Sequence, residues 1–545
     1  MRHVLPAVKW NFASFVVFAA LLGAQQAPPS KKPGKLEGVV LNSVTNDPVK
    51  KATVTLQALG QPTNHSATTD ATGHFHFDSV EPGKYVAMAN RDGYIPEQDN
   101  RRGPWGKPIT VAEEQEVKDL ALKLVPLALI SGHVLDEDGD PVARAQVQAL
   151  RYAYLPGGTK RLNPAGFATT NDLGEYQLLD LEPGRYYLLA VVQQRMGRPM
   201  TRLRRATAEQ AYPDIFYPSA SQAEQATATQ VGAGAQVTGI DFRLHKVAAF
   251  HIRGKAVDGR TGQPLRNAQI WIQSSGRFGR GGSQIQQNGT FDVPGVVSGS
   301  YTVNCQTEDL SSRQAIDIGD HDVDDVVVVT RPPFEISGTV RLEGTPPPQE
   351  QRGKMRVNLN MLEMGNGAGA EVNADGTFTL KVTPGAYAIN AFCDAGAYVK
   401  SIHFGDQDVS SGKIDLTQQS SGALDIVCGT DVGQIQGTVQ NDNGEPAAQA
   451  MISVVPDEER YNREDLFVQL VSDQNGKFDY RDLAPGDYKV FAWESMDSQM
   501  LQSAEFRKAF ESRAASVTVS SGGNASVQVK MIPAADVEAE KNKLP

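Results

Sequence analysis

The chain has 545 residues, with 63 acidic and 52 basic side chains and a formal net charge of −11. This charge argues against general nucleic-acid binding, which needs a basic face. Three cysteines in the whole chain also exclude a scaffold that is held together by many disulfides.

The N-terminal segment has the features of a secretory signal peptide. Arg2 and Lys9 give it a basic start, the apolar run 12–22 is too short to span a bilayer, and Leu22-Gly23-Ala24 suits cleavage. We therefore expect residues 1–24 to be removed on export, the alternative being an uncleaved membrane anchor. Residues 25–35, rich in Gln, Pro and Lys, are predicted to form a flexible leader.

A Pro-Gly-x-Tyr motif recurs along the chain, each time a few residues after a turn signal and an aromatic residue. Complete copies end in Tyr85, Tyr186, Tyr387 and Tyr488, and a degenerate Ser-Gly-Ser-Tyr copy ends in Tyr301. Each copy also has an opening glycine: Gly38, Gly132, Gly254, Gly338 and Gly437. The copies are about 100 residues long, a common domain size. The sequence therefore predicts one small domain repeated five times.

Each copy has the pattern of β-structure. Apolar and polar residues alternate in stretches such as Gly73-His74-Phe75-His76-Phe77, which is typical of strands that bury one face. The preceding turn is predicted to form around a short polar residue that bonds the nearby backbone. These residues are Asp70, Asp172, Asn288, Asp375 and Asp473. The best helical candidates are the short segments 206–212 and 503–512.

The order Gly-x-Val, Pro-x-x-Ala-x-Val, Asp-x-x-Gly-x-Phe and Pro-Gly-x-Tyr resembles the carboxypeptidase regulatory-like domain. The resemblance covers roughly residues 36–533 and is clearest in copies one, two and five. It implies an all-β fold, a tandem array of five seven-stranded antiparallel β-sandwiches of the transthyretin-like (prealbumin-like) Greek-key type. Such domains are also similar to the Cna B-type repeats of bacterial surface proteins. A sandwich of this kind hosts many roles, so the resemblance does not fix a function.

The repeat spacing gives five domains and a tail. The predicted ranges are 36–126, 127–248, 249–333, 334–431 and 432–533, followed by a disordered tail at 534–545. The joints at 124–127 and 330–334 are short and contain Pro, so we expect an elongated, semi-rigid array. The repeat tyrosines should be buried, with each hydroxyl bonded to backbone near its turn, as in a tyrosine corner.

The second domain carries a basic insertion. Its arginines are Arg195, Arg198, Arg202, Arg204 and Arg205. They form either a patch for an anionic polymer or lipid headgroups, or a solvated loop.

The cysteines allow one bridge. Cys393 and Cys428 fall on predicted neighbouring strands of the fourth domain. They form one disulfide in an oxidising compartment, or they are two small buried apolar residues. Cys305 is expected to be buried and inert.

No pattern for catalysis is present in the sequence. None of the nine histidines has Glu at the third following position, as a zinc peptidase motif requires. A Gly-x-Ser-x-Gly elbow, a Walker A loop and a dinucleotide fingerprint are also absent. We therefore predict no enzyme, no catalytic residue and no cofactor.

The resemblance raises the further question of an internal Lys–Asn isopeptide bond. In some surface-protein relatives a Glu four residues after the repeat tyrosine assists that bond. Here the corresponding positions are Ala89, Ala190, Cys305, Ala391 and Ala492. Self-crosslinking is therefore not expected.

Two groups of side chains could hold a metal ion. His74 and His76 should lie on one outer strand face, and His65 joins them if its strand pairs across the turn at 70–73. The other interpretation is that these are ordinary polar surface positions, and we predict no metal ligand. The turn from Asp136 to Asp140 resembles the start of a calcium loop but lacks its closing Glu, so turn chemistry explains it better.

Two tryptophans could bind sugar. Trp271 lies between Ile270 and Ile272, which should point inward and leave the indole outside, and Trp105 lies in a Gly/Pro-rich loop. An exposed indole can stack on a sugar ring, or it can pack against a neighbouring domain.

These features predict an exported, non-catalytic binding or spacer protein of a bacterial envelope, secreted or periplasmic. Its expected partner is an extracellular or periplasmic protein or polysaccharide, and not nucleic acid. The alternatives are a carbohydrate-binding protein and an accessory component of an outer-membrane transport system.

Overall fold

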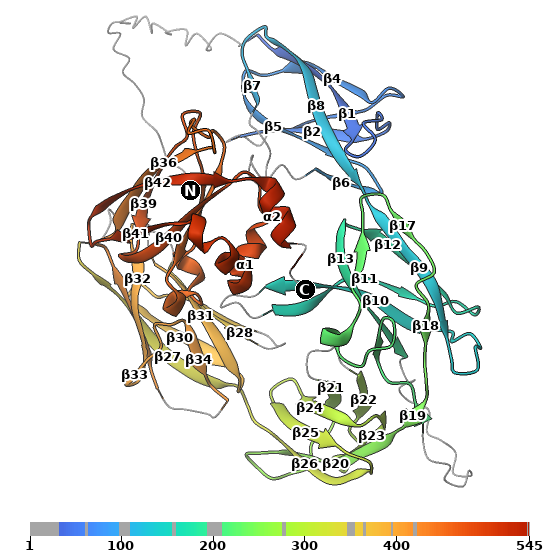
Figure 1. The fold of residues 1–545 in the computed structure, drawn as a ribbon. Coiled ribbons are helices and arrows are strands. Elements are labelled where there is room, and N and C mark those ends of the chain that lie inside the picture. Colours follow the sequence, from blue (N-terminus) through green and yellow to red (C-terminus); the bar gives the residue numbers. More distant parts are fainter. Residues whose placement is uncertain are drawn as a thin grey trace, which may run out of the picture.

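The computed structural model describes residues 32–59, 64–97, 109–154, 160–192, 210–274, 280–345, 355–362, 367–393, 396–417, 422–541 and 543. These residues group into five sets of strands, here called units 1 to 5 in chain order (Figure 1). Each unit encloses its own cluster of buried apolar side chains. The predicted all-β class is confirmed. The expected signal peptide lies outside the described residues, whereas Gly34 and Lys35, assigned above to the leader, already belong to a strand.

Unit 1 shows the basic plan of two facing sheets. Its strands are β1 (Gly34–Asn42), β2 (Thr53–Ala58), β3 (Asn64–Thr68), β4 (His74–Val80), β5 (Gly83–Asn90), β6 (Tyr94–Pro96), β7 (Ile109–Val111) and β8 (Glu116–Pro126). One sheet has the order β4-β1-β8-β6 and the other β3-β2-β5-β7. Alternate residues such as Leu36, Val40, Val54 and Leu56 are fully buried between the sheets, as a period of two requires.

Unit 2 follows the same plan with a longer insertion. Its elements are β9 (Ala128–Leu135), β10 (Ala145–Tyr154), β11 (Lys160–Thr169), β12 (Glu175–Leu181), β13 (Gly184–Val192), β14 (Gln210–Ala211), β15 (Ile215–Phe216), η3 (Ala223–Gln225), β16 (Thr229–Val231), β17 (Gln236–Val237), β18 (Phe242–Arg243) and β19 (Val247–Ala248). The helix expected at 206–212 is wrong where it can be checked, because 210–211 form strand β14, paired with β19.

Units 3 and 4 also have two sheets each. Unit 3 consists of β20 (Phe250–Asp258), β21 (Gln269–Ser274), β22 (Arg280–Gln284), β23 (Thr290–Val296), β24 (Gly299–Gln306), β25 (Ser311–Ile318) and β26 (Val323–Thr330). Unit 4 consists of β27 (Phe334–Glu343), β28 (Arg356–Met361), β29 (Ala368–Glu371), β30 (Thr377–Val382), β31 (Ala386–Phe392), β32 (Tyr398–Phe404), β33 (Gln407–Asp408), β34 (Lys413–Asp415) and β35 (Leu424–Gly429).

Unit 5 carries the two α-helices of the described residues. Its elements are β36 (Gly433–Gln440), β37 (Met451–Pro456), η5 (Glu458–Arg460), η6 (Glu464–Leu466), β38 (Val468–Val471), β39 (Lys477–Leu483), β40 (Gly486–Trp493), η7 (Ser498–Gln502), α1 (Ala504–Ala509), η8 (Glu511–Arg513), β41 (Ala515–Val519), β42 (Asn524–Ile532) and α2 (Ala534–Lys541). The helix expected at 503–512 is confirmed by α1, whose first turn is capped by the Ser503 hydroxyl.

The tail does not match its prediction of disorder, because residues 534–541 form α2. The reason is an apolar cluster on the outer face of unit 5. Phe491 and Trp493 of β40 stack with ring centroids 5.2 Å apart, and they pack with Phe506 of α1 and Val537 of α2. These aromatic rings would face water without the two helices, so their burial stabilises the tail as a helix.

Strand pairing differs in two respects from the expected antiparallel sandwich. In every unit the first strand pairs in parallel with a strand near the end of the unit, for example β1 with β8 and β36 with β42. In unit 5, β40 also pairs in parallel with β42, which joins the strands into one seven-stranded sheet. The number of strands that the described residues form also varies, since units 3 and 5 have seven and unit 1 has eight.

The parallel pairing explains the opening glycine of each repeat. A Cβ atom added to Gly132 would overlap the backbone oxygen of Ile240 on the neighbouring chain segment. The same overlap with backbone oxygen arises in the other units, at Gly38, Gly254, Gly338 and Gly437. Only glycine allows this close approach.

The five repeat tyrosines have one environment, and the prediction of a tyrosine corner is confirmed. All are at most 5% exposed. Each hydroxyl donates to the backbone oxygen four residues earlier, at 2.6–2.9 Å. The tyrosines are Tyr85, Tyr186, Tyr301, Tyr387 and Tyr488. Their shared position and shared bond mark them as folding residues.

The repeat turns also form as expected, with one correction. In unit 1, Asp70 Oδ1 accepts the N–H groups of Thr72 and His74 at 2.8 and 2.9 Å. In unit 2 the residue with this role is Asn171, and not Asp172 as predicted, because the Asn171 side chain accepts from the N–H groups of Leu173 and Glu175. Asn171 stands three residues before the turn glycine, as Asp70 does.

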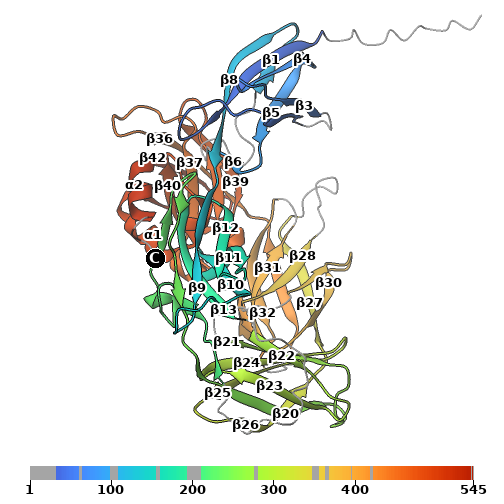
Figure 2. The same ribbon diagram turned by 90° about the vertical axis from the view of Figure 1, so that its right-hand side faces the viewer.

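The course of the chain differs from the expected elongated array. Figures 1 and 2 show the units along a curved path, with unit 1 projecting at one end and unit 5 returning towards unit 2. At this return η7 lies against β10, and Tyr154 at the end of β10 interacts with the Ser503 side chain and is 8% exposed. The added cluster of aromatic rings and helices on unit 5 supplies this contact, which the repeat pattern alone does not predict.

Of the two interpretations of the cysteine pair in unit 4, the disulfide is confirmed. Cys393 and Cys428 are bonded, with Cα atoms 6.1 Å apart. Cys393 follows β31 and Cys428 lies on β35, so the bond joins the two sheets of unit 4 rather than neighbouring strands of one sheet.

Cys305 is buried, as predicted, and this burial determines the reactivity of its thiol. It is 1% exposed, and burial raises the pKa of its thiol to about 11. At pH 8 only about one thousandth of this thiol would be thiolate, the reactive form. We expect no labelling of the native chain by a maleimide and full labelling after denaturation. Rapid native labelling would contradict the burial.

Candidate functional site

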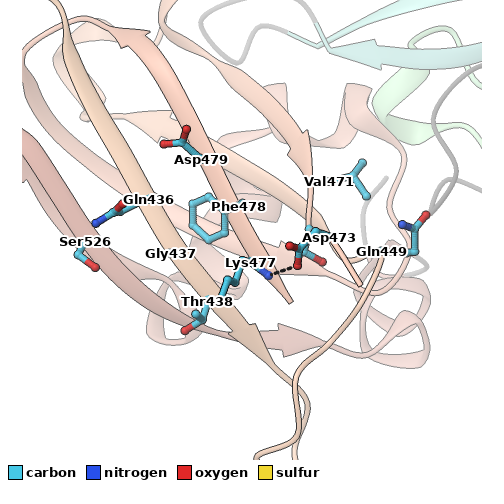
Figure 3. Close-up of a pocket in the computed structure, with 11 residues that line it drawn as sticks. Gln436, Gly437, Thr438, Gln449, Val471, Asp473, Lys477, Phe478, Asp479 and Ser526 are labelled. Carbon is cyan, nitrogen blue, oxygen red and sulfur yellow. Dashed lines mark hydrogen bonds between the residues drawn. The ribbon is translucent and has the colours of Figure 1, made fainter. Parts of the chain in front are cut away.

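A cavity of about 880 Å³ lies on unit 5 (Figure 3). Three neighbouring strands contribute to it: Gln436 and Thr438 come from β36, Lys477 and Asp479 from β39, and Ser526 from β42. The segment 471–473 and Gln449 close one end.

Strand register places these side chains together. Gln436 is the cross-strand partner of both Asp479 and Ser526, and Thr438 is the partner of Lys477. Side chains directly opposite each other on one sheet face are within contact range. The lining therefore forms two polar rows across the edge of the sheet. Phe478 lies between them along β39 and is 5% exposed, with its ring against Gly437.

The Asp473 carboxylate of the lining is held in place by the repeat turn. Asp473 Oδ1 accepts the N–H groups of Lys477 and Asn475, both at 2.8 Å. These bonds lower the pKa of the Asp473 carboxyl, because they favour its charged form. Asp479 contacts the Gln434 amide and lies 3.5 Å from Arg481.

This arrangement suits hydrogen bonding to a polar ligand. It offers amide, hydroxyl, carboxylate and ammonium groups, but Asp473 is occupied by its own turn. In the part of the chain that the structure describes, no group of three or more His, Cys, Asp or Glu could hold a metal ion. Within the same residues, no helix is long and apolar enough to cross a membrane.

A second cavity of about 430 Å³ lies between units 4 and 5. Beside it Arg463 of unit 5, 4% exposed, donates to the backbone oxygens of Val399 and Ser410 in unit 4 at 2.9 and 3.3 Å. Its charge is balanced by Asp465 at 2.6 Å. Asn390 of unit 4 also donates to Glu464 at 3.2 Å. These bonds fix the two units against each other.

Replacing Arg463 with alanine should loosen this junction. The change removes the donors of two backbone oxygens, and hydrogen bonds to charged groups contribute about 1.5–3 kcal/mol each. We expect faster hydrogen exchange in 398–411 and 458–467, with the remainder of both units unchanged. Arg481→Ala, which removes an exposed arginine of the same unit, is the matched control and should leave both segments unchanged. Equal exchange in the two variants would contradict a role for Arg463 at the junction.

The histidines do not come together as the metal hypothesis requires. Strand β3 pairs with β2 and not with β4, so the pairing assumed across the turn is wrong. The His65 ring instead packs near the rings of Tyr85 and Phe77, with centroids 6.1 and 6.3 Å apart. His74 and His76 are exposed on β4.

Trp271 is half-buried on β21 between the buried Ile270 and Ile272, as predicted. In the turn at 136–140, Asp136 Oδ1 accepts the N–H groups of Asp138 and Asp140 at 3.0 and 2.9 Å, which is turn chemistry. Trp105 and the arginines between 195 and 205 lie outside the described residues.

Sequence reasoning missed both cavities. The unit 5 lining uses side chains that are ordinary polar residues on outward strand positions, so no motif marks them. The junction with unit 4 depends on η5 and η6, an insertion that the repeat pattern does not contain. The interval from Ala450 to Gly476 in the fifth repeat is longer than in copies one and three, but it is longer still in copy two, so length alone does not mark this insertion.

Comparison with known proteins gives a match for one unit. Residues 35–124 match the family model of the carboxypeptidase regulatory-like domain. A search of curated proteins found no significant match.

Several solved structures are similar at low identity. A minor pilin of Streptococcus agalactiae is 15% identical over 39% of this chain and 96% of its own, with a TM-score of 0.21. A streptococcal ancillary pilin is 14% identical over 55% of this chain and 99% of its own, with a TM-score of 0.18. The major pilin subunit of Bacillus cereus is 12% identical over 55% of this chain and all of its own, with a TM-score of 0.17.

Proposed function

We propose that the chain is an exported, non-catalytic binding or spacer protein of a bacterial envelope, built from five tandem β-sandwich domains. The proposed domains are the ranges 36–126, 127–248, 249–333, 334–431 and 432–533, with 534–541 added to the last as its helix α2. The first is supported by the family match at 35–124.

The observation that carries this proposal is that the residues repeated in every unit serve the folding of that unit. The five tyrosines each bond their own backbone, and the opening glycines allow one close approach of backbone. The features that recur therefore serve folding. We therefore assign binding to features that differ between units, such as the unit 5 cavity, because loops and edges commonly carry function on rigid scaffolds.

Fractionation of the producing cells tests the location. We expect the protein in the envelope or the medium, with a mature N-terminus after residue 24. A cytoplasmic protein that keeps Met1 would overturn the export part of the proposal. A broad hydrolase screen on the purified chain tests the other part, since activity that one point substitution abolishes would show an enzyme.

Carbohydrate binding is the second candidate, and two observations favour it. The indole of Trp271 keeps part of its surface outside, and the unit 5 cavity offers amide and hydroxyl groups that match the hydroxyls of a sugar. A glycan array with wild type, Trp271→Ala and Gln436→Ala tests it. Loss of a glycan signal in either variant would favour this function, whereas no signal in wild type would leave a protein partner or a spacer.

A further inference from the structure

Unit 2 exposes three large apolar side chains in one short stretch. Phe167 at the end of β11, Leu173 in the following turn and Leu179 on β12 are 72%, 64% and 57% exposed. Single exposed apolar residues are normal on a protein surface. Three within one strand–turn–strand segment need an explanation.

The other units show that folding does not require them. At the same distances from the turn glycine (Gly73, Gly289, Gly376 and Gly476), the chain has other residues. In place of Phe167 it has Ser66, Gly282, Gly369 and Gln469. In place of Leu173 it has Thr72, Asn288, Asp375 and Asn475. In place of Leu179 it has Asp78, Pro294, Lys381 and Arg481. Large apolar residues at all three positions are a feature of unit 2.

Among the described residues, the strands that carry Phe167 and Leu179 are edge strands. Strand β11 pairs with β10 and strand β12 with β9, and each is the last strand of its sheet. An edge strand presents unpaired backbone groups, and proteins commonly protect such edges with charged residues or proline. Units 1, 3, 4 and 5 follow that rule at the Leu179 position. Unit 2 has Leu179 at this position instead of a charged residue or proline. An edge without such protection allows a strand of another chain to add to it.

The surrounding charge indicates the chemistry of the partner. From 162 to 184 the chain has four acidic residues and no Lys, Arg or His. The acids are Asp172, Glu175, Asp180 and Glu182. Glu182 is paired with Arg151 at 3.2 Å, and Glu175 accepts from Asn171 at 2.8 Å. The edge as a whole still presents an acidic rim around apolar residues, which complements a basic segment.

We propose that this edge of unit 2, here called the apolar edge (Phe167, Leu173 and Leu179 with β12), binds an extended segment of a partner protein. The segment adds as a strand beside β12, its Lys or Arg side chains face the carboxylates, and its apolar side chains cover the three exposed residues. The inference rests on the proposed binding function and adds the class of partner to it.

The test uses a synthetic peptide of alternating lysine and valine as the probe, with a glutamate–valine peptide as its charge control. We expect the full-length chain to bind the first peptide and not the second. Binding should weaken as salt rises, because the charge attraction is screened. Hydrogen exchange should slow at the β12 amides of 175–178 when the peptide is bound.

Variants separate the two parts of the surface. Phe167→Gln with Leu173→Asn and Leu179→Thr removes the apolar part without changing charge, and it should weaken peptide binding about tenfold or more, as loss of a central apolar cluster commonly does. Glu175→Gln with Asp180→Asn should remove most of the salt dependence. Val327→Thr, at another exposed apolar residue, is the control and should bind like wild type.

Three outcomes would overturn the proposal. They are no binding of the lysine–valine peptide, equal binding by the triple variant that still has native hydrogen exchange, and a dimer of the full chain that the triple variant abolishes. The last result would assign the edge to a second copy. None of them bears on envelope location, which the fractionation tests separately.

Discussion

Replacing Tyr186 with alanine should unfold unit 2 and leave units 3 and 4 folded. Tyr186 is 1% exposed and donates to the Glu182 backbone oxygen at 2.6 Å. Truncation of a large buried aromatic residue costs about 3–5 kcal/mol, a large part of the roughly 5–15 kcal/mol that a domain has. Hydrogen exchange resolved by segment is the measurement, and β9 to β13 should lose protection together.

Unit 5 should respond only where it contacts unit 2. Tyr154 interacts with the Ser503 side chain, so η7 and α1 should exchange faster while β36 to β42 remain protected. Tyr186→Phe is the control, because it keeps the ring and removes one hydrogen bond, at a cost of about 0.5–1.5 kcal/mol. An alanine variant as stable as the phenylalanine variant would show that the ring is not part of the unit 2 core.

Removing the disulfide of unit 4 should have an effect of similar size. The bond closes a loop with a sequence separation of 35, for which the chain-entropy relation gives about 4 kcal/mol. Substituting alanine at both Cys393 and Cys428 should therefore lower the stability of β27 to β35 and leave unit 1 unchanged. Denaturant unfolding followed by hydrogen exchange in each unit is the measurement.

Cys305→Ala is the matched control for the disulfide variant. It removes one small buried sulfur from the core of unit 3 and no covalent bond. We expect a loss confined to unit 3, with unit 4 as stable as in wild type. If reduction of the wild-type chain left unit 4 unchanged, the bond would not contribute to its stability.

The repeated parts of the fold could be predicted from the sequence because each depends on local chemistry. The tyrosine corner needs a ring and a hydroxyl four residues after a backbone oxygen, and the turn needs a short polar side chain before glycine. The alternation around Phe75 and Phe478 likewise fixed which residues are buried. The shift from Asp172 to Asn171 shows the limit, because two adjacent residues can both cap a turn and the sequence does not rank them.

The remaining features depend on contacts between distant residues. Helix α2 forms because its Val537 packs in the same apolar cluster as Trp493 and Phe506, although the tail alone is polar. The return of unit 5 to unit 2 and the Arg463 junction come from insertions that do not repeat. The cavity residues Gln436 and Ser526 meet only through strand register. The three histidines considered as a possible metal site do not come together, because β3 joins a different sheet from β4.

The central claim is that the repeated residues hold each unit together and do not form binding sites. The most direct measurement uses one chain in which all five repeat tyrosines are phenylalanine. We expect every unit to remain folded and to lose about 0.5–1.5 kcal/mol of stability by hydrogen exchange, while binding of the lysine–valine peptide and of any glycan is unchanged. Unchanged stability in all five units together with lost binding would contradict it, because the hydroxyls would then act on a ligand.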